Sequence, residues 1–228
     1  MKLTVLGNYG PYAKPGGYAT SGYLVEEGDT RLVLDLGAGT LTNLLDIAPP
    51  ETLSGIFVSH LHYDHISDLF ALRYALEQKN LSLNLFLAEE DCDLYRLLTG
   101  HRLFNVINID EDTRLELYDF SLTFLKTRHT VTNHAVKISG AKTLVYSGDT
   151  VYFEGLDDFV AGADAFLADC TQKPGSKVPH MTVDDALHFA DSGIRVLATH
   201  LPVDFDPEPY FDGTGNIETV KYKGVYNI

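Results

Sequence analysis

The sequence has few of the features that mark secreted, disulfide-bonded or membrane proteins. It contains only two cysteines, Cys92 and Cys170, too few for a disulfide framework, so we expect both to be small buried thiols. No apolar run is long enough to span a membrane. The apolar part of the N-terminal stretch is too short for a signal peptide and predicts a strand instead. These absences predict a cytoplasmic protein with no membrane partner.

Basic residues are also scarce. Lys and Arg number 17 against 32 Asp and Glu, which gives a formal net charge of −15. A protein that binds long nucleic acids normally has a basic face, so the charge balance argues against extended nucleic-acid binding. It still allows a small phosphate ester that binds directly to metal. The 228 residues, 45% of them hydrophobic and 21% charged, suit a single α/β domain over 1–228.

Three histidines and one aspartate stand within six residues, in the run Ser59-His60-Leu61-His62-Tyr63-Asp64-His65. The apolar residues 56–58 before it predict a buried strand, and the amphipathic segment after it predicts a helix over 66–79. In an extended chain His60 and His62 point the same way and can reach one ion, whereas Asp64 and His65 point elsewhere. The alternative is an exposed histidine-rich loop. Imidazole and carboxylate suit zinc, and also manganese or iron.

Three further candidate ligands each follow an apolar run at a predicted strand end, namely His129, Asp149 and His200. Ligands at the ends of several strands are what a preorganised site needs. The H-x-H-x-D-H motif followed by these three residues resembles the metallo-β-lactamase fold superfamily of metallohydrolases, from Gly7 to about His200. The resemblance implies an αββα sandwich, in which two mixed β-sheets pack face to face with helices outside. Strand-rich halves before and after about residue 110 suit that architecture.

The resemblance also implies a ligand set for two divalent ions, most readily zinc. One ion is held by His60, His62 and His129 and the other by Asp64, His65 and His200, while Asp149 bridges them. Such a pair of ions lowers the pKa of a shared water and leaves a hydroxide nucleophile. Asp64 is expected to orient this nucleophile and accept its proton.

Two other residues bear on this site. Asp35 matches a family position that supports the metal site by hydrogen bonding, although an aspartate there is also typical of a helix N-cap or a turn. His134 competes with His129 for the ligand role. We favour His129 because it stands at a strand end, whereas His134 begins the next strand.

A second motif, His180-Met181-Thr182, precedes a predicted helix that runs to Asp191. It resembles the ribonuclease Z-like branch, where a His-x-Thr contacts the scissile phosphate. That branch also has a His-Glu-Ala-Thr box, but here the stretch is Ala168-Asp169-Cys170-Thr171, so its histidine is missing. The resemblance implies that Asp169 orients His180 as an acid–histidine pair. The alternative is a surface or helix-entry histidine, and we interpret His101 and His188 as structural.

Together these resemblances imply a hydrolase of a small phosphodiester or short RNA end. The sequence has no basic insertion like the tRNA-binding arm of the tRNA-processing members. Ile66-Ser67-Asp68-Leu69 after the motif lacks the glycines common in lactonases, yet hydrolysis of a carboxylic ester, lactone or thioester is the main alternative. A diiron redox scaffold is another, although its flavin partner domain is missing. A homodimer is a family expectation, and residues 217–228 are expected to form a closing strand.

Overall fold

The computed structural model describes residues 1–12 and 19–228, whose strands form two sheets of seven. The first sheet has the order β14-β1-β2-β3-β4-β5-β6, with bounds Val225–Asn227, Lys2–Gly7, Gly22–Glu27, Thr30–Leu36, Gly55–Phe57, Leu83–Leu87 and Phe104–Asn108. The second has the order β13-β12-β11-β10-β9-β8-β7, with bounds Ile217–Thr219, Arg195–Thr199, Ala165–Asp169, Thr143–Tyr146, His134–Ser139, Phe120–Lys126 and Arg114–Leu117. The helices are α1 (Thr40–Leu45), α2 (Tyr63–Lys79), α3 (Asp93–Thr99), α4 (Glu154–Val160) and α5 (Val183–Asp191).

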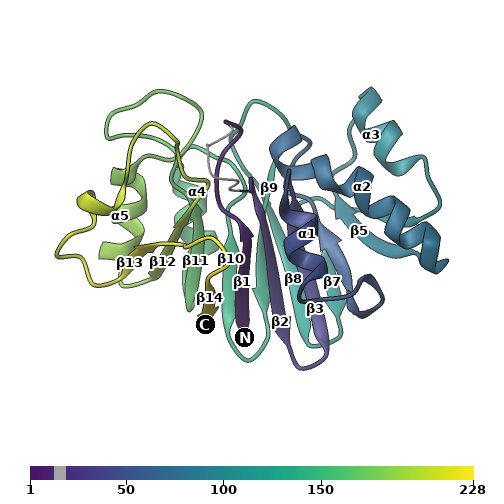
Figure 1. Cartoon of the computed structure of the whole chain (residues 1–228). Coiled ribbons are helices and arrows are strands. Elements are labelled where there is room, and N and C mark those ends of the chain that lie inside the picture. The colour runs from purple at the N-terminus through teal and green to yellow at the C-terminus, as the bar shows by residue number, and fades with distance from the viewer. Residues whose placement is uncertain (13–18) are drawn as a thin grey trace.

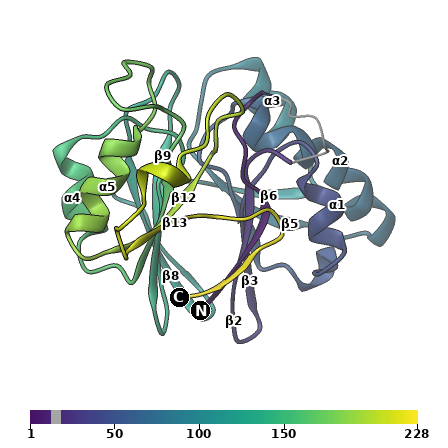
Figure 2. The same cartoon turned by 60° about the vertical axis from the view of Figure 1, so that its left-hand side comes forward.

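Both sheets are mixed. In the first sheet β3 to β6 pair in parallel, whereas β14, β1, β2 and β3 pair in antiparallel fashion. In the second sheet β10 to β13 are parallel and β7 to β10 antiparallel. The two sheets face each other, with α1, α2 and α3 outside the first and α4 and α5 outside the second (Figure 2). This arrangement confirms the predicted αββα sandwich.

Neighbouring residues of a strand serve different layers of the core, because their side chains point to opposite faces of the sheet. In β4, Ile56 packs beneath the helices of the first sheet, while Phe57 lies between the two sheets. Phe57 stacks on Phe124 of β8, with ring centroids 5.7 Å apart. These contacts join the two halves of the chain into one layered structure.

The predicted element boundaries hold in most places and fail in two that matter. Helix α2 begins at Tyr63 rather than at residue 66, so Asp64 and His65 belong to its first turn. Residues 217–228 do not form one closing strand, because the chain turns at Lys223, whose φ is 59°, and at Gly224. As a result β13 pairs with β12 of the second sheet, while β14 pairs with β1 of the first.

The carboxyl ends of the central strands meet at one edge of the sandwich, opposite the two chain termini (Figure 1). The loops at this edge and the first turn of α2 carry all of the predicted metal-binding residues. Both cysteines are free; Cys170 is buried and Cys92 is half-buried. Within the described residues, no helix combines the length and the apolar character needed to cross a membrane.

Candidate metal centre

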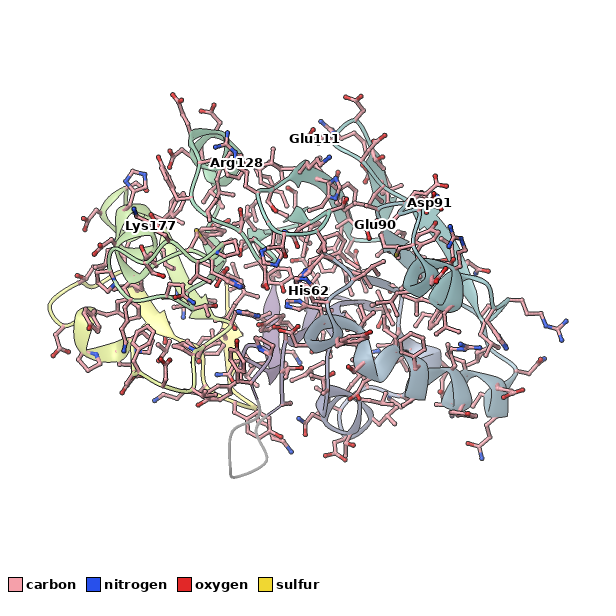
Figure 3. All side chains as sticks on the ribbon, turned by 90° about the horizontal axis from the view of Figure 1, so that it is seen from above. His62, Glu90, Asp91, Glu111, Arg128 and Lys177 are labelled. Carbon is pink, nitrogen blue, oxygen red and sulfur yellow. The ribbon has the colours of Figure 1, made fainter. Side chains whose placement is uncertain are left out.

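Segments from both sheets supply the candidate centre. The run 59–62 follows β4, and Asp64 and His65 open helix α2. From the second sheet come His129 after β8, Asp149 after β10 and His200 after β12. Positions distant in sequence therefore converge where the two sheets meet, with His62 near the middle when the molecule is seen from above (Figure 3).

The first donor group consists of His60, His62, His129 and Asp149, whose donor atoms all lie within 4.8 Å of one another. Nδ1 of His62 is 2.9 Å from Nε2 of His60 and 3.2 Å from Nε2 of His129. The Asp149 carboxylate is 3.6 Å from Nε2 of His60 and 3.8 Å from Nε2 of His129. Three imidazole nitrogens and one carboxylate thus face a common point.

The second donor group consists of Asp64, His65, Asp149 and His200, again within 4.8 Å. Nε2 of His200 lies 3.2 Å from the Asp64 carboxylate and 3.3 Å from that of Asp149. Nε2 of His65 is 3.4 Å from the other oxygen of Asp149. Asp149 therefore belongs to both donor groups: one of its oxygens faces His60, His129 and His200, and the other faces His65.

The residues in these groups fit divalent metal ions. Nε2 of His65 is buried and makes no hydrogen bond within the described residues, which is costly unless a ligand satisfies it. Three imidazole nitrogens converge in the first donor group. A proton shared between two of them makes one hydrogen bond, but the lone pair of the third nitrogen then faces another lone pair. A cation bound to all three removes that conflict. Imidazole with carboxylate is a donor set that zinc, manganese and iron accept.

The ring nitrogens that face away from the centre have oxygen partners. Nδ1 of His65 donates to Asp35 at 2.7 Å, and that of His129 donates to the Pro179 carbonyl at 2.9 Å. Nδ1 of His200 lies 2.6 Å from the Thr171 hydroxyl. Such outer hydrogen bonds fix the tautomer and ring orientation of metal-binding histidines. Pro179 and Thr171 were not predicted for this role, because hydrogen bonds to a carbonyl or a threonine leave no distinctive sequence pattern.

Asp35 is the most heavily used of these partners. It is fully buried at the end of β3, and it accepts hydrogen bonds from the Ser59 amide and hydroxyl, from His65 and from the Tyr146 hydroxyl, all at 2.7 Å. Its φ of 54° is a strained conformation for a residue other than glycine. Asp35 thus links His65 to the core between the sheets. Tyr146 was not recognised from the sequence, where it is one apolar position of a strand.

Buried charges set the protonation of the centre. Burial raises the pKa of the Asp149 carboxyl, but His200, His65 and His60 outweigh it and hold that pKa well below its usual value. Burial lowers the pKa of His60, and the neighbouring His65 lowers it further. Burial also lowers the pKa of His65, but Asp149 and Asp35 outweigh it and raise the pKa well above its usual value. Asp149 is therefore ionised, and His60 is neutral and able to bind metal.

His180 and Asp169 stand next to the second donor group. Nδ1 of His180 lies 2.8 Å from the Asp169 carboxylate, and its ring stacks on that of His200 with centroids 5.1 Å apart. Asp169 also binds the amide and hydroxyl of Thr171. A third cluster, made of Asp149, Asp169, His180 and His200, results from these contacts. The motif around His180 is thus brought to the centre.

The other histidines lie elsewhere. His134 begins β9, where its backbone amide donates to the Ser59 carbonyl, and its ring is not part of the three clusters found among the described residues. His188 lies on α5 and pairs with Asp157 at 2.9 Å. His101 is half-buried outside these clusters.

A cavity of about 490 Å³, here called the metal cavity, opens above the centre and is lined by His62, His129, Asp149 and Asp64 of the donor groups and by His180. Seen from above, Arg128 and Lys177 lie on one side of His62, and Glu90 and Asp91 on the other (Figure 3). Both Arg128 and Lys177 are exposed. The basic side is the one toward which an anionic group would be drawn.

Comparison with known proteins agrees with this geometry. The family model described as "Beta-lactamase superfamily domain" matches residues 30–200. The chain belongs to this superfamily. Together with the His/Asp donor groups, membership defines a metallo-hydrolase of the metallo-β-lactamase fold.

Individual relatives span almost the whole chain. "Probable metallo-hydrolase YhfI" of Bacillus subtilis is 34% identical over 214 residues, which cover 89% of this chain and 87% of the relative. The crystal structure of YhfI covers 99% of this chain and 98% of its own, with a TM-score of 0.90 and 30% identity. Human tRNase Z, short form, has a TM-score of 0.79 at 18% identity and covers 100% and 99%. A diphosphatase of the PhnP family has a TM-score of 0.81 at 15% identity and covers 100% and 97%.

Proposed function

We propose that the protein is a phosphodiesterase with a dinuclear, most suitably zinc, centre. His60, His62 and His129 would hold one ion, Asp64, His65 and His200 the other, and Asp149 would bridge them. When bound, the two ions would supply Lewis acidity toward the phosphoryl group and toward an attacking water. We favour a phosphodiester as the substrate because the His180–Asp169 pair lies beside the second donor group.

His180 is suited to an anionic substrate. Burial lowers its pKa, but the Asp169 carboxylate at 2.8 Å outweighs burial and raises the pKa to about 9. The imidazole therefore carries a proton at neutral pH. A positive, donating group at this position binds a phosphoryl oxygen in the ground state and protonates the leaving oxygen as the ester bond breaks. A neutral carboxylic ester offers less charge for it to stabilise.

Asp64 supplies the complementary base. Burial raises the pKa of its carboxyl, but the hydrogen bond from His200 and the neighbouring His65 imidazole outweigh burial and keep the pKa well below its usual value. An ionised carboxylate that lines the metal cavity can accept the proton of the attacking water. Asp64 is thus suited to be the base and His180 the acid, because their surroundings shift their pKa values in opposite directions.

The rim and the overall charge favour a small substrate. Arg128 and Lys177 offer positive charge on one side of His62, whereas Glu90 and Asp91 lie on the other side (Figure 3). With a net charge of −15, the molecule repels a long polyanion. Two structural neighbours, a tRNase Z and a diphosphatase, have names that refer to phosphorus esters or anhydrides, which supports this substrate class.

The test compares initial rates on an activated phosphodiester and a matched carboxylic ester, with zinc-loaded and manganese-loaded protein and Asp149→Asn as the background. We expect metal-dependent phosphodiester turnover that His180→Gln lowers at least a hundredfold, since general acid catalysis contributes roughly 10²–10⁴. His188→Gln, on α5 outside the clusters, is the matched control and should keep the wild-type rate. Turnover of the carboxylic ester alone would instead assign an ester, lactone or thioester hydrolase.

A further inference from the structure

Beside the metal cavity lies a second hollow, here called the side cavity, of about 590 Å³. Three segments enclose it among the described residues: residues 10–12, residues 171–176 after β11 and residues 201–205 after β12. Pro11 lines both cavities, so they share a wall. A hollow of this size is in the range that proteins use for small ligands.

The inner end of the side cavity touches a metal-binding residue. The Thr171 hydroxyl lies 2.6 Å from Nδ1 of His200. A Cβ placed on Gly10 would come within 3.0 Å of the His200 ring, so only glycine fits here without displacing that ring. The inner end of the side cavity therefore lies next to the His200 imidazole. A group attached to a phosphate in the metal cavity can enter the side cavity at this end.

Backbone hydrogen bonds hold this inner wall in place. The Gly10 amide donates to the Leu201 carbonyl at 3.2 Å, and the Leu201 amide donates to the Asn8 carbonyl at 2.7 Å. The Cys170 amide donates to the Thr199 carbonyl at 2.9 Å. The wall is thus formed before any ligand arrives, which lowers the entropic cost of binding.

The lining identifies the kind of group that fits. It is mostly apolar and contains the flat aromatic rings of Tyr12 and Phe205 together with the saturated rings of Pro174 and Pro202. Among the described residues, its charged side chains are one cation, Lys173, and one anion, Asp204. Lys173 Nζ lies 5.2 Å from the centroid of the Phe205 ring. Balanced charge and flat walls favour a neutral, planar ring over a second anionic group.

We propose that the side cavity is a specificity subsite that binds a neutral aromatic substituent of the substrate. The proposal rests on the proposed function, because the substituent is attached to the phosphate that binds in the metal cavity. It predicts that the protein prefers phosphate esters of aromatic alcohols to those of small aliphatic alcohols. The preference should arise in binding, since the ring lies away from the reacting atoms.

Isothermal titration calorimetry on zinc-loaded protein tests this without relying on turnover. We expect phenyl phosphate to bind about tenfold more tightly than methyl phosphate, since burying a ring is worth at least that factor. Val203→Trp, which fills the side cavity, should bring the two affinities within twofold and leave methyl phosphate binding unchanged. Val225→Trp, on β14 away from both cavities, is the matched control and should keep the tenfold preference.

Phe205→Ala provides a second variant, which removes a ring from the wall and should also reduce the preference. Any of three results would overturn the subsite. The two esters could bind the wild-type protein with equal affinity, phenyl phosphate could fail to bind, or the preference could be undiminished in both Val203→Trp and Phe205→Ala. A phenyl preference together with no turnover of any phosphodiester would leave the subsite standing and remove the proposed function.

Discussion

A single hydroxyl, that of Tyr146, connects the core between the sheets with the second donor group. Tyr146 is 2% exposed and donates to Asp35, which in turn accepts from Nδ1 of His65. The chain of hydrogen bonds leaves Nε2 of His65 to face the centre. Orientation of a candidate metal-binding histidine thus depends on a residue outside both donor groups.

Tyr146→Phe is expected to weaken zinc binding about tenfold, since loss of an outer hydrogen-bond partner typically costs 10–100-fold in metal affinity. Competition with a chromophoric chelator measures this directly. Tyr152→Phe removes a hydroxyl of the same kind, which donates to Asp157 away from the centre, and should leave zinc affinity unchanged. Equal zinc affinity in the two variants would show that Asp35 orients His65 without Tyr146.

The two cysteines differ in their surroundings, although the sequence suggested that both were buried. Cys170 is fully buried, and burial together with Asp169 raises the pKa of its thiol. Cys92 is half-buried and caps α3, where its sulfur accepts from the Tyr95 amide. We expect a thiol reagent to modify one cysteine in the native protein and two in denaturant. Cys92→Ser should abolish native labelling, and labelling that persists in this variant would place Cys170 within reach of solvent.

At the scale of the element, α5 is held at its start by reciprocal hydrogen bonds. The Thr182 hydroxyl accepts from the Asp185 amide, and the Asp185 carboxylate accepts from the Thr182 amide. This capping box satisfies two backbone groups that a helix start leaves unpaired. It also fixes the chain just after His180, which occupies the metal cavity two residues earlier.

Thr182→Ala is expected to lower the free energy of unfolding by about 1 kcal/mol, the typical cost of losing an N-cap. Urea denaturation measures it as a lower midpoint at unchanged slope. Thr42→Ala, an exposed position of α1, is the control and should change stability by less than about 0.5 kcal/mol. A loss no larger than that of the control would mean that packing alone determines where α5 begins.

The boundaries of α5 and the strand ends that carry the site follow from local sequence. Thr182 with acids after it is a helix start, and apolar runs followed by His or Asp place candidate ligands at strand ends. What local sequence could not show was pairing between distant segments. Residues 217–228 have the composition of a strand, yet they are divided between the two sheets. β14 pairs with β1, about two hundred and twenty residues earlier in the chain, and β13 pairs with β12, about twenty residues earlier.

The same limit applies within the candidate site. The donor residues were visible because the chain has only 9 histidines, three of which stand with Asp64 in one short run. Their partners Tyr146, Thr171 and the Pro179 carbonyl were not, since a hydroxyl or a carbonyl acquires its role only when folding places it beside an imidazole. The start of α2 was predicted three residues late because Tyr63, Asp64 and His65 lack the apolar period that revealed the rest of the helix.

At the scale of the whole molecule, the two donor groups lie where the sheets meet. The first sheet and its helix α2 contribute His60, His62, Asp64 and His65, and the second sheet contributes His129, Asp149 and His200. An ion bound in either group would therefore join the two halves of the sandwich. Without ions, the carboxylate of Asp149 and the imidazole nitrogens that face it remain buried close to one another.

Removal of metal should for this reason destabilise the fold as well as end catalysis. A ligand at a thousand times its dissociation constant stabilises the native state by about 4 kcal/mol, and about 1 kcal/mol shifts the Tm of a domain of this size by 2–4 °C. We expect a strong chelator to lower the Tm by about 10 °C and added zinc to restore it. In Asp149→Asn, which weakens both donor groups, the chelator should have a much smaller effect. A wild-type Tm that does not respond to the chelator would show that the sandwich is held by its core alone, and the proposed ions would then have no part in joining its halves.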